Sequence, residues 1–405
     1  MAKKKTAKQS PENKKLKPNR SSGKVGPVTE VTTSRDIADR TRWMLWGKAA
    51  GRCEFSGCNN LLWLNPVTQE QVNIAEAAHI YAFSSKGPRG NRGIRKDKLN
   101  KLDNLMLACH ACHKTMDQDK TGTKYSVELL QQWKNAHEKR VETVTAIDPK
   151  KSSHIVFFEA PIGNQTAPLA FDKAAHALFP DYYPAEPRVF ELGSSNSTFQ
   201  DKSPEYWQVM RQTLDVNFDR KVLQLRETGE IKHLSIFGIA PQPLLIYLGS
   251  LIVDISAAQV YQLYREPNSG WNWPETEQTL DLQIRKPDHT NGPPALVIAL
   301  TADVANERIS SVLPDACIWM VTMPQPRHDH IKSQKDLSYF RQEVRKLLDE
   351  IKLRHGQQEP LHIFPVAGNS VSIELGRIRQ PKAMMPWLLY DQIQGRGFVH
   401  VMDIN

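Results

Sequence analysis

Residues 103–117 read DNLMLACHACHKTMD and contain two cysteines, Cys109 and Cys112, in a Cys-x2-Cys spacing. A second close pair, Cys53 and Cys58, lies upstream in a Cys-x4-Cys spacing. A structural zinc site takes four thiolates that are commonly delivered as two pairs from two turns. The sequence therefore predicts structural Zn²⁺ at these four cysteines, against the alternative of four unrelated thiols.

The fifth cysteine and the N-terminus bear on the compartment. Cys317 lies in the apolar run ACIWMV (316–321), which predicts a buried strand. We find no N-terminal apolar segment that could act as a secretory signal, so we expect a reducing, cytoplasmic compartment. In that compartment close cysteine pairs bind metal more often than they form disulfides. No run is apolar enough to span a bilayer, so we expect no membrane partner.

Groups able to do chemistry lie beside the cysteines. A zinc site with four protein ligands has no open position for substrate, so a reaction needs neighbouring side chains. His79 lies in the apolar-rich run 72–83, which predicts a strand or hairpin, and Asn104 precedes the second cysteine pair. A helix predicted to begin near Cys112 places His113 and Asp117 four residues apart on one face.

This order of His, Asn and Cys-x2-Cys-His resembles the HNH, or ββα-metal, nucleases. The resemblance implies an α+β domain in which a strand pair and a helix close on one divalent cation. It implies that His79 is the general base that activates water and that Asn104 holds the His79 loop in register. It also implies that His113, with Asp117, binds catalytic Mg²⁺ or another divalent cation against a phosphate oxygen.

The sequence departs from that family at one position. Many HNH nucleases have Asp directly before the base histidine as a metal ligand, whereas Ala78 stands here. The remaining ligand therefore stays open, with Glu76 and Asp117 as candidates. The alternative to catalysis is that His79 is an ordinary core histidine and that His113 is a surface group near the zinc turn.

Basic residues concentrate in two segments. Residues 86–101 hold seven Lys or Arg and one Asp, which predicts a loop that contacts phosphates without reading bases, or else a solvated loop. Residues 1–24 hold eight Lys, one Arg and one Glu, so they account for +8 of the net charge of +9. We expect residues 1–33 to be a disordered basic tail that retains DNA nonspecifically or only aids solubility.

The chain is long enough for more than one domain. Its 405 residues are 40% hydrophobic, which can build separate cores. Helices predicted at 34–50 and 126–144 flank the zinc region, and PKKSS (149–153) predicts a linker. We therefore predict a nuclease domain at 34–148 and a second domain at 149–405.

The second domain alternates short apolar strands with helices, which predicts an α/β fold with a mostly parallel sheet. The expected strands lie at 155–158, 234–239, 296–300, 318–322 and 362–365, and the expected helices at 167–178, 204–226 and 336–355.

Several short motifs of this half resemble a SAVED domain. They are LSIFGIAPQPLLIYLG (234–249), VYQLYR (260–265), WNW (271–273), HIFPVA (362–367), SIELGR (372–377) and LYD (389–391). The resemblance implies two fused Rossmann-like units that bind a cyclic di- or trinucleotide second messenger made by a partner enzyme.

Candidates for contacting that nucleotide share three chemistries. Aromatic rings could stack on bases, cations could meet phosphates, and the turns at 238–243 and 366–370 could present backbone N–H groups. The candidates are Pro241, Tyr264, Arg265, Trp271, Trp273, Arg379, Lys382 and Tyr390. Simple burial is the alternative for the aromatic rings.

An HNH unit joined to a SAVED unit resembles the effector nucleases of bacterial CBASS antiphage systems. That resemblance implies an endonuclease that degrades double-stranded DNA when a cyclic nucleotide binds and promotes homo-oligomer formation. Two alternatives stay open. One is a ligand-independent HNH restriction or repair nuclease, and the other is a nonenzymatic zinc-dependent DNA-binding regulator.

Overall fold

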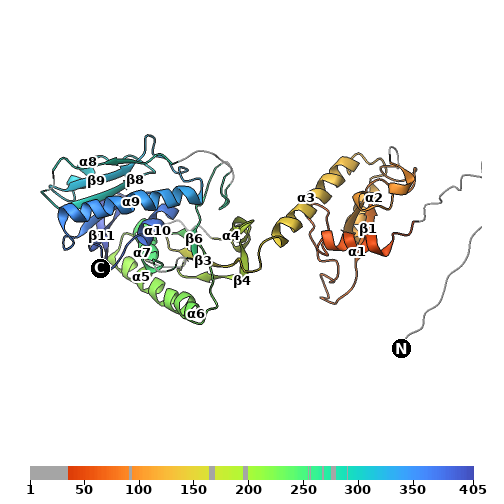
Figure 1. Cartoon of the computed structure of the whole chain (residues 1–405), viewed down its shortest axis with the longest axis horizontal. Coiled ribbons are helices and arrows are strands. Elements are labelled where there is room, and N and C mark those ends of the chain that lie inside the picture. Colours follow the sequence, from red (N-terminus) through yellow and green to blue (C-terminus); the bar gives the residue numbers. More distant parts are fainter. Residues whose placement is uncertain are drawn as a thin grey trace, which may run out of the picture. The chain divides into compact units, whose positions relative to one another are not determined.

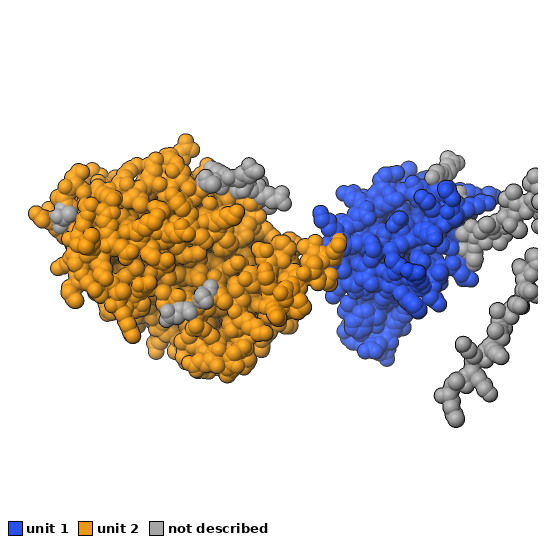
Figure 2. Space-filling model, in the orientation of Figure 1, with its two compact units in different colours: residues 1–141 blue, residues 142–405 orange. Residues whose placement is uncertain are grey.

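The computed structural model describes residues 35–90, 94–163, 169–194, 199–253, 255, 257–266, 269–274, 280–289 and 291–405. The expected tail at 1–33 lies outside these residues. The chain divides into two compact units, residues 1–141 and 142–405 (Figure 2). The division falls within helix α3 (Val127–Thr145), a few residues before the boundary predicted at 148.

The first unit is built on a strand pair followed directly by a helix (Figure 1). Strands β1 (Ala75–His79) and β2 (Leu105–Cys109) are antiparallel, with His79 opposite Leu105. Every residue of β2 is buried, and Cys109 passes straight into α2 (His110–Gln118). The other elements are helix α1 (Asp39–Lys48) and the 3-10 turns η1 (Lys96–Lys98) and η2 (Leu102–Asn104).

The second unit contains a parallel sheet of four strands in the order β4-β3-β5-β6. Its strands are β3 (Ser152–Glu159), β4 (Tyr183–Glu191), β5 (Leu234–Ile239) and β6 (Ala258–Val260). Helix α4 (Phe171–Leu178) follows β3, and α5 (Pro204–Phe218) continues through a π turn (Asp219–Leu223) into α6 (Gln224–Glu227). The helix predicted at 204–226 is therefore present as one continuous helical stretch.

A sheet of six strands in the order β12-β11-β10-β8-β9-β7 makes up the rest of this unit. Its strands are β7 (Gln283–Arg285), β8 (Pro294–Ala299), β9 (Cys317–Thr322), β10 (Leu361–Val366), β11 (Trp387–Ile393) and β12 (Gly397–Ile404). The four inner strands run parallel, and the edge strands β7 and β12 pair antiparallel. Short helix α8 (Asn306–Ser310) follows β8, and long helix α9 (Gln334–His355) shares the main core cluster with the sheet (Figure 1). The mixed sheets and helices confirm the α/β fold expected for this half.

Two glycines let helices α7 (Gln242–Leu251) and α10 (Asn369–Arg377) cross closely. A Cβ atom on Gly249 would lie 2.0 Å from the Ile373 carbonyl oxygen, and one on Gly376 would lie 1.9 Å from the Ile246 carbonyl oxygen. Because α7 follows β5 and α10 follows β10, this crossing joins the two sheets through equivalent elements.

Adding a single methyl group at this crossing should destabilise the second unit. Gly376→Ala forces two helix backbones apart, and overpacking of that kind costs about 3 kcal/mol or more. We expect the melting temperature of this unit to fall by about 6–12 °C in calorimetry. Gly270→Ala is the matched control, because among the described residues the only atom within 4 Å of its added Cβ is Asn272 Oδ1, at 4.0 Å. Equal melting temperatures for both variants would contradict the close crossing.

Candidate functional site

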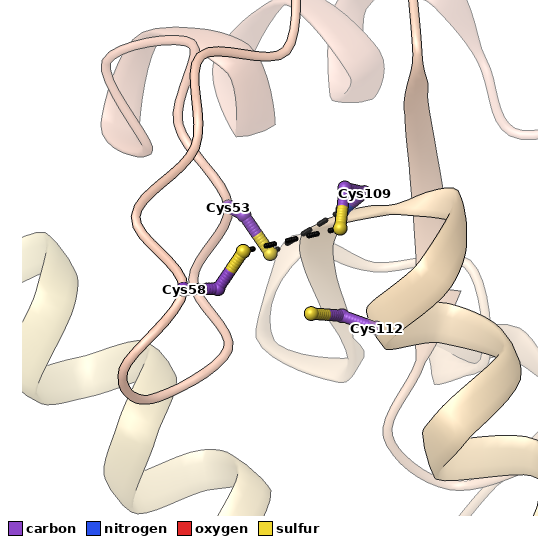
Figure 3. A group of neighbouring side chains, drawn as sticks. All are labelled: Cys53, Cys58, Cys109 and Cys112. Atoms are coloured by element: carbon purple, nitrogen blue, oxygen red, sulfur yellow. Dashed lines mark hydrogen bonds between the residues drawn. The ribbon is translucent and has the colours of Figure 1, made fainter. Parts of the chain in front are cut away.

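The four cysteines of the first unit converge (Figure 3). Cys53 and Cys58 lie in the loop after α1, Cys109 ends β2, and Cys112 lies in the first turn of α2. Their four Sγ atoms all lie within 4.8 Å of one another, with Cys58 and Cys109 at 3.9 Å. Four sulfurs around one tetrahedral zinc ion would be about 3.8 Å apart. The donor set therefore fits a metal such as zinc, and it is the one such cluster in the described part of the chain.

The pKa values of these thiols indicate what a bound metal ion would change. Burial raises the pKa of the Cys53 thiol to about 12 and also raises that of Cys112. Burial opposes ionisation of Cys109 as well, but hydrogen bonds from Cys112 and the other cysteines lower its pKa overall. A bound dication would stabilise the thiolates that burial otherwise disfavours.

His79 ends strand β1 and is partly exposed. Its Nε2 atom lies 2.9 Å from Oδ1 of Asn100. An amide oxygen can only accept, so the hydrogen is on Nε2 and the lone pair is on Nδ1. Sequence reasoning missed Asn100, which stands twenty-one residues away along a loop and carries no local signal.

Asn104 is buried and fixes the chain just after His79. Its Oδ1 accepts from the backbone N–H of Tyr81 at 2.7 Å, while its Nδ2 donates to the carbonyls of Tyr81 and Leu99. The Asn104 carbonyl also accepts from the Ile80 N–H at 2.9 Å. This is the contact expected of a residue that holds the His79 loop, although its effect on catalysis stays a prediction.

His113 and Asp117 share one face of α2, with His113 Nε2 at 3.5 Å from Asp117 Oδ2. Glu76, the other candidate ligand, is three residues from His79 on β1 and so lies on the opposite face of the strand. It pairs there with His110 at 3.3 Å. The structure therefore removes Glu76 as a ligand beside His79.

The structure also explains the residue that stands directly before His79. Ala78 is only 1% exposed and belongs to the core of the first unit, so an acidic side chain there would be buried. Among the described residues His79, His113 and Asp117 do not assemble into a three-ligand cluster, so a divalent ion here would keep open positions. Mg²⁺ commonly retains several waters in sites of this kind.

The position of Arg89 differs from the expectation that the basic residues at 86–101 contact phosphates. Its side chain is only 3% exposed, and its guanidinium donates to backbone carbonyls inside the unit rather than facing phosphates. Burial lowers the pKa of Arg89, and neighbouring Asp117 acts in the opposite direction. The loop's Lys86, Lys96, Lys98 and Lys101 remain exposed.

In the second unit, the turns before α7 and α10 lie together. The Asn369 side chain donates to the Gly238 carbonyl at 2.9 Å, and the Ala367 N–H donates to Gln242 Oε1 at 3.0 Å. The Ala367 N–H, which was expected to face a phosphate, thus donates to a side-chain acceptor instead. Gln242 was not singled out from the sequence, because its partner is far away along the chain.

The eight candidate ligand contacts are not gathered into one place. Trp271 is buried against Phe237, with ring centroids 5.0 Å apart, whereas Tyr390 stacks on Phe364 in a different core cluster. Tyr264 is also buried, and its hydroxyl donates to the Ile331 carbonyl at 2.7 Å. Burial therefore accounts for these three rings.

The remaining candidates differ in exposure. Arg379 is buried and donates to the Ile404 carbonyl at 3.2 Å, whereas Arg265 and Lys382 are exposed. Trp273 is partly buried, and Pro241 precedes the first turn of α7. Their contact with a nucleotide stays a prediction.

Comparison with known families finds a match within the second unit. Residues 214–404 match the family model SAVED, described as "SMODS-associated and fused to various effectors sensor domain". Residues 214–404 are therefore similar to a SAVED sensor domain, and the mixed α/β architecture of this part of the chain fits that similarity. Among curated proteins, none matches the chain.

Solved structures of Cap4 SAVED/CARF-domain containing receptors are similar to this chain. The Acinetobacter baumannii receptor with the cyclic trinucleotide 2'3'3'-cAAA has 12% identity and a TM-score of 0.43, over 73% of this chain and 66% of that chain. The Moraxella osloensis receptor has 12% identity and a TM-score of 0.39, over 78% and 71%. This chain thus spans just under two thirds of the first receptor's length.

Across the described residues, every helix is too short or too polar to pass through a lipid bilayer.

Proposed function

We propose that the chain is a metal-dependent HNH endonuclease that a cyclic oligonucleotide activates to degrade double-stranded DNA in antiphage defence. The observation that carries the nuclease assignment is the setting of His79. Its Nδ1 lone pair is fixed by Asn100, and the backbone that follows is held by buried Asn104. The strand pair and α2 around it repeat the ββα order of HNH nucleases.

In the proposed reaction, His79 Nδ1 accepts a proton from a water molecule as the water oxygen bonds to phosphorus and a P–O ester bond breaks. Asn100 holds the ring, and Asn104 prevents the loop from shifting. His113 would hold a divalent ion such as Mg²⁺, which supplies positive charge to the phosphate oxygens when bound. Zinc at the four cysteines would have a structural role only.

The sensor half supplies the regulation. We infer that its two sheets correspond to the two fused Rossmann-like units of a SAVED domain and that they bind a cyclic di- or trinucleotide. A ligand shifts an equilibrium only if it binds the active state better than the resting state. We propose that this active state is a homo-oligomer, as the resemblance to CBASS effectors implies.

Activation should therefore depend on both ligand and protein concentration. Purified chain with Mg²⁺ would be tested on plasmid DNA against synthetic cyclic di- and trinucleotides, including the 2'3'3'-cAAA and 3'3'3'-cAAA found with the Acinetobacter baumannii receptor. We expect one compound to trigger cleavage and to raise the particle mass in light scattering. Full activation at unchanged mass would refute the assembly step.

The same assay separates the alternatives. Full cleavage without any cyclic nucleotide would favour a ligand-independent restriction or repair nuclease. DNA binding without cleavage under every condition would favour a zinc-dependent DNA-binding regulator.

A further inference from the structure

The carboxylate of Asp117 lies between the ring of His113 and the guanidinium of Arg89. Its Oδ2 atom is 3.5 Å from His113 Nε2, and its Oδ1 atom is 3.5 Å from Arg89 Nη2. Arg89 Nη2 donates to Oδ1, and Oδ2 faces a ring nitrogen of His113. A carboxylate with a nitrogen beside each oxygen is poorly placed to be a direct metal ligand as well.

Arg89 reaches the other half of the site. Its Nε donates to the Ile80 carbonyl at 2.8 Å, and its Nη2 lies 3.5 Å from the His79 carbonyl. Its Nη1 donates to the Met116 carbonyl at 3.2 Å, at the end of α2. One buried guanidinium thus joins the segment that carries His79 to the helix that carries His113.

The loop beneath Arg89 holds the arginine in place. A Cβ atom on Gly122 would lie 2.8 Å from Arg89 Cγ and 2.9 Å from the Arg89 backbone nitrogen. Asp119 fixes that loop, because its carboxylate accepts from the backbone N–H groups of Gly122, Lys124 and Tyr125. Arg89 has a positive φ of 64°, which a non-glycine residue keeps only when its surroundings enforce it.

We propose that Arg89 and Asp117 are positioning residues of the nuclease site. Asp117 accepts the Nε2 hydrogen of His113, which leaves Nδ1 free to bind the divalent ion, and Arg89 fixes Asp117 relative to His79. Metal-binding histidines usually donate their other ring N–H to such a carboxylate or carbonyl. This inference rests on the proposed function, and it replaces the expectation that Asp117 is itself a ligand.

The first test reads the His113 tautomer directly. The full chain labelled with ¹⁵N-histidine is studied by NMR at a pH where the ring is neutral, with His113→Ala identifying the signal. We expect the Nε2–H tautomer in the wild type and a mixture of tautomers in Asp117→Ala. Asp117 is 47% exposed, so its replacement should leave the fold intact. A wild-type Nδ1–H tautomer, or one unchanged in Asp117→Ala, overturns the proposal.

The second test uses Mn²⁺ alone, with electron paramagnetic resonance reporting bound ion. We expect Arg89→Gln to weaken Mn²⁺ binding about tenfold, within the range seen when outer partners of a metal ligand are lost. Arg89→Lys, which keeps a positive charge beside Asp117, should recover part of that loss. The control is Lys114→Gln, which removes a cation from α2, the helix that carries His113 and Asp117. Wild-type Mn²⁺ binding by Arg89→Gln, or no recovery in Arg89→Lys, overturns the Arg89 assignment.

The outcomes separate this inference from the nuclease assignment, because neither readout needs DNA or an activating ligand. If the chain cuts DNA but the tautomer does not depend on Asp117, the positioning role fails alone. If the tautomer depends on Asp117 in a chain that cuts no DNA, the result supports the Asp117–His113 contact and counts against the proposed nuclease. If the Arg89→Gln protein loses its zinc, the His113 tautomer in Asp117→Ala still tests the proposal.

Discussion

His79→Ala is expected to reduce the rate of DNA cleavage by about 10²–10⁴-fold, because a positioned general base contributes a factor of this size. The measurement is plasmid cleavage at saturating activator and Mg²⁺. Zinc content, melting temperature and cyclic-nucleotide binding should stay unchanged. His79 is partly exposed, and among the described residues its ring makes a hydrogen bond to Asn100 and an edge contact with Phe83.

The matched control for this variant is His110→Ala. His110 also lies close to the second cysteine pair, but its ring is exposed and pairs with Glu76 on the other face of β1. We expect near wild-type cleavage from His110→Ala. A folded His79→Ala protein that cuts DNA at the wild-type rate would remove His79 as the base and with it the main support for the nuclease assignment.

Local patterns in the sequence were sufficient where one segment determines its own structure. The apolar run at 234–239 predicted β5 with its observed bounds, and the alternation of strands and helices predicted the helix at 204–226. The cysteine spacing predicted a cluster that the structure brings within 4.8 Å. Each of these signals arises from neighbours in sequence, so no knowledge of the tertiary fold was needed.

Sequence patterns did not predict the features that depend on tertiary contacts. Strand β4 contains Pro184 and Pro187 and lacks an apolar alternation, so its pairing at the edge of the sheet was not predicted. Arg89 was interpreted as part of a phosphate-binding loop, but the fold turns its guanidinium inward. A basic side chain in a glycine-rich loop gives no sign of its direction until the carbonyls around it are placed.

The aromatic residues of the sensor half show the same limit. Trp271 and Tyr390 were candidates for stacking on bases, with burial as the alternative, and the structure packs Trp271 on Phe237 of β5 and Tyr390 on Phe364 of β10. A buried ring and a ligand-stacking ring have the same sequence signature in an α/β domain, since both follow apolar strands. The pairing of the turns before α7 and α10 through Gln242 likewise appears only when the two sheets are assembled.

Replacing either cysteine at the start of α2 should have the largest effect on stability. Cys109→Ser or Cys112→Ser leaves three thiolates, and zinc binding contributes about 10–16 kcal/mol to the folding of small zinc-finger peptides. That contribution exceeds or equals the entire stability of most domains, which is about 5–15 kcal/mol. We therefore expect the first unit to lose its zinc and unfold, while the second unit, which contains three core clusters of its own, remains folded.

Metal analysis and limited proteolysis would test this expectation, with about one zinc per chain in the wild type. Cys317→Ala is the control, because Cys317 is buried in β9 of the other unit and should change stability without changing zinc content. In the variants at Cys109 or Cys112, protease should remove the first unit and leave a fragment that begins near the end of α3. A wild-type chain that contains no zinc and still cuts DNA in strong chelator with excess Mg²⁺ would overturn the structural zinc assignment. Since burial raises the pKa of Cys53 and Cys112, the metal-free form of the site would favour protonation of these two thiols, which would then contribute only packing. Packing of four small side chains could not replace the coupling that zinc gives between the loop after α1 and the β2–α2 junction.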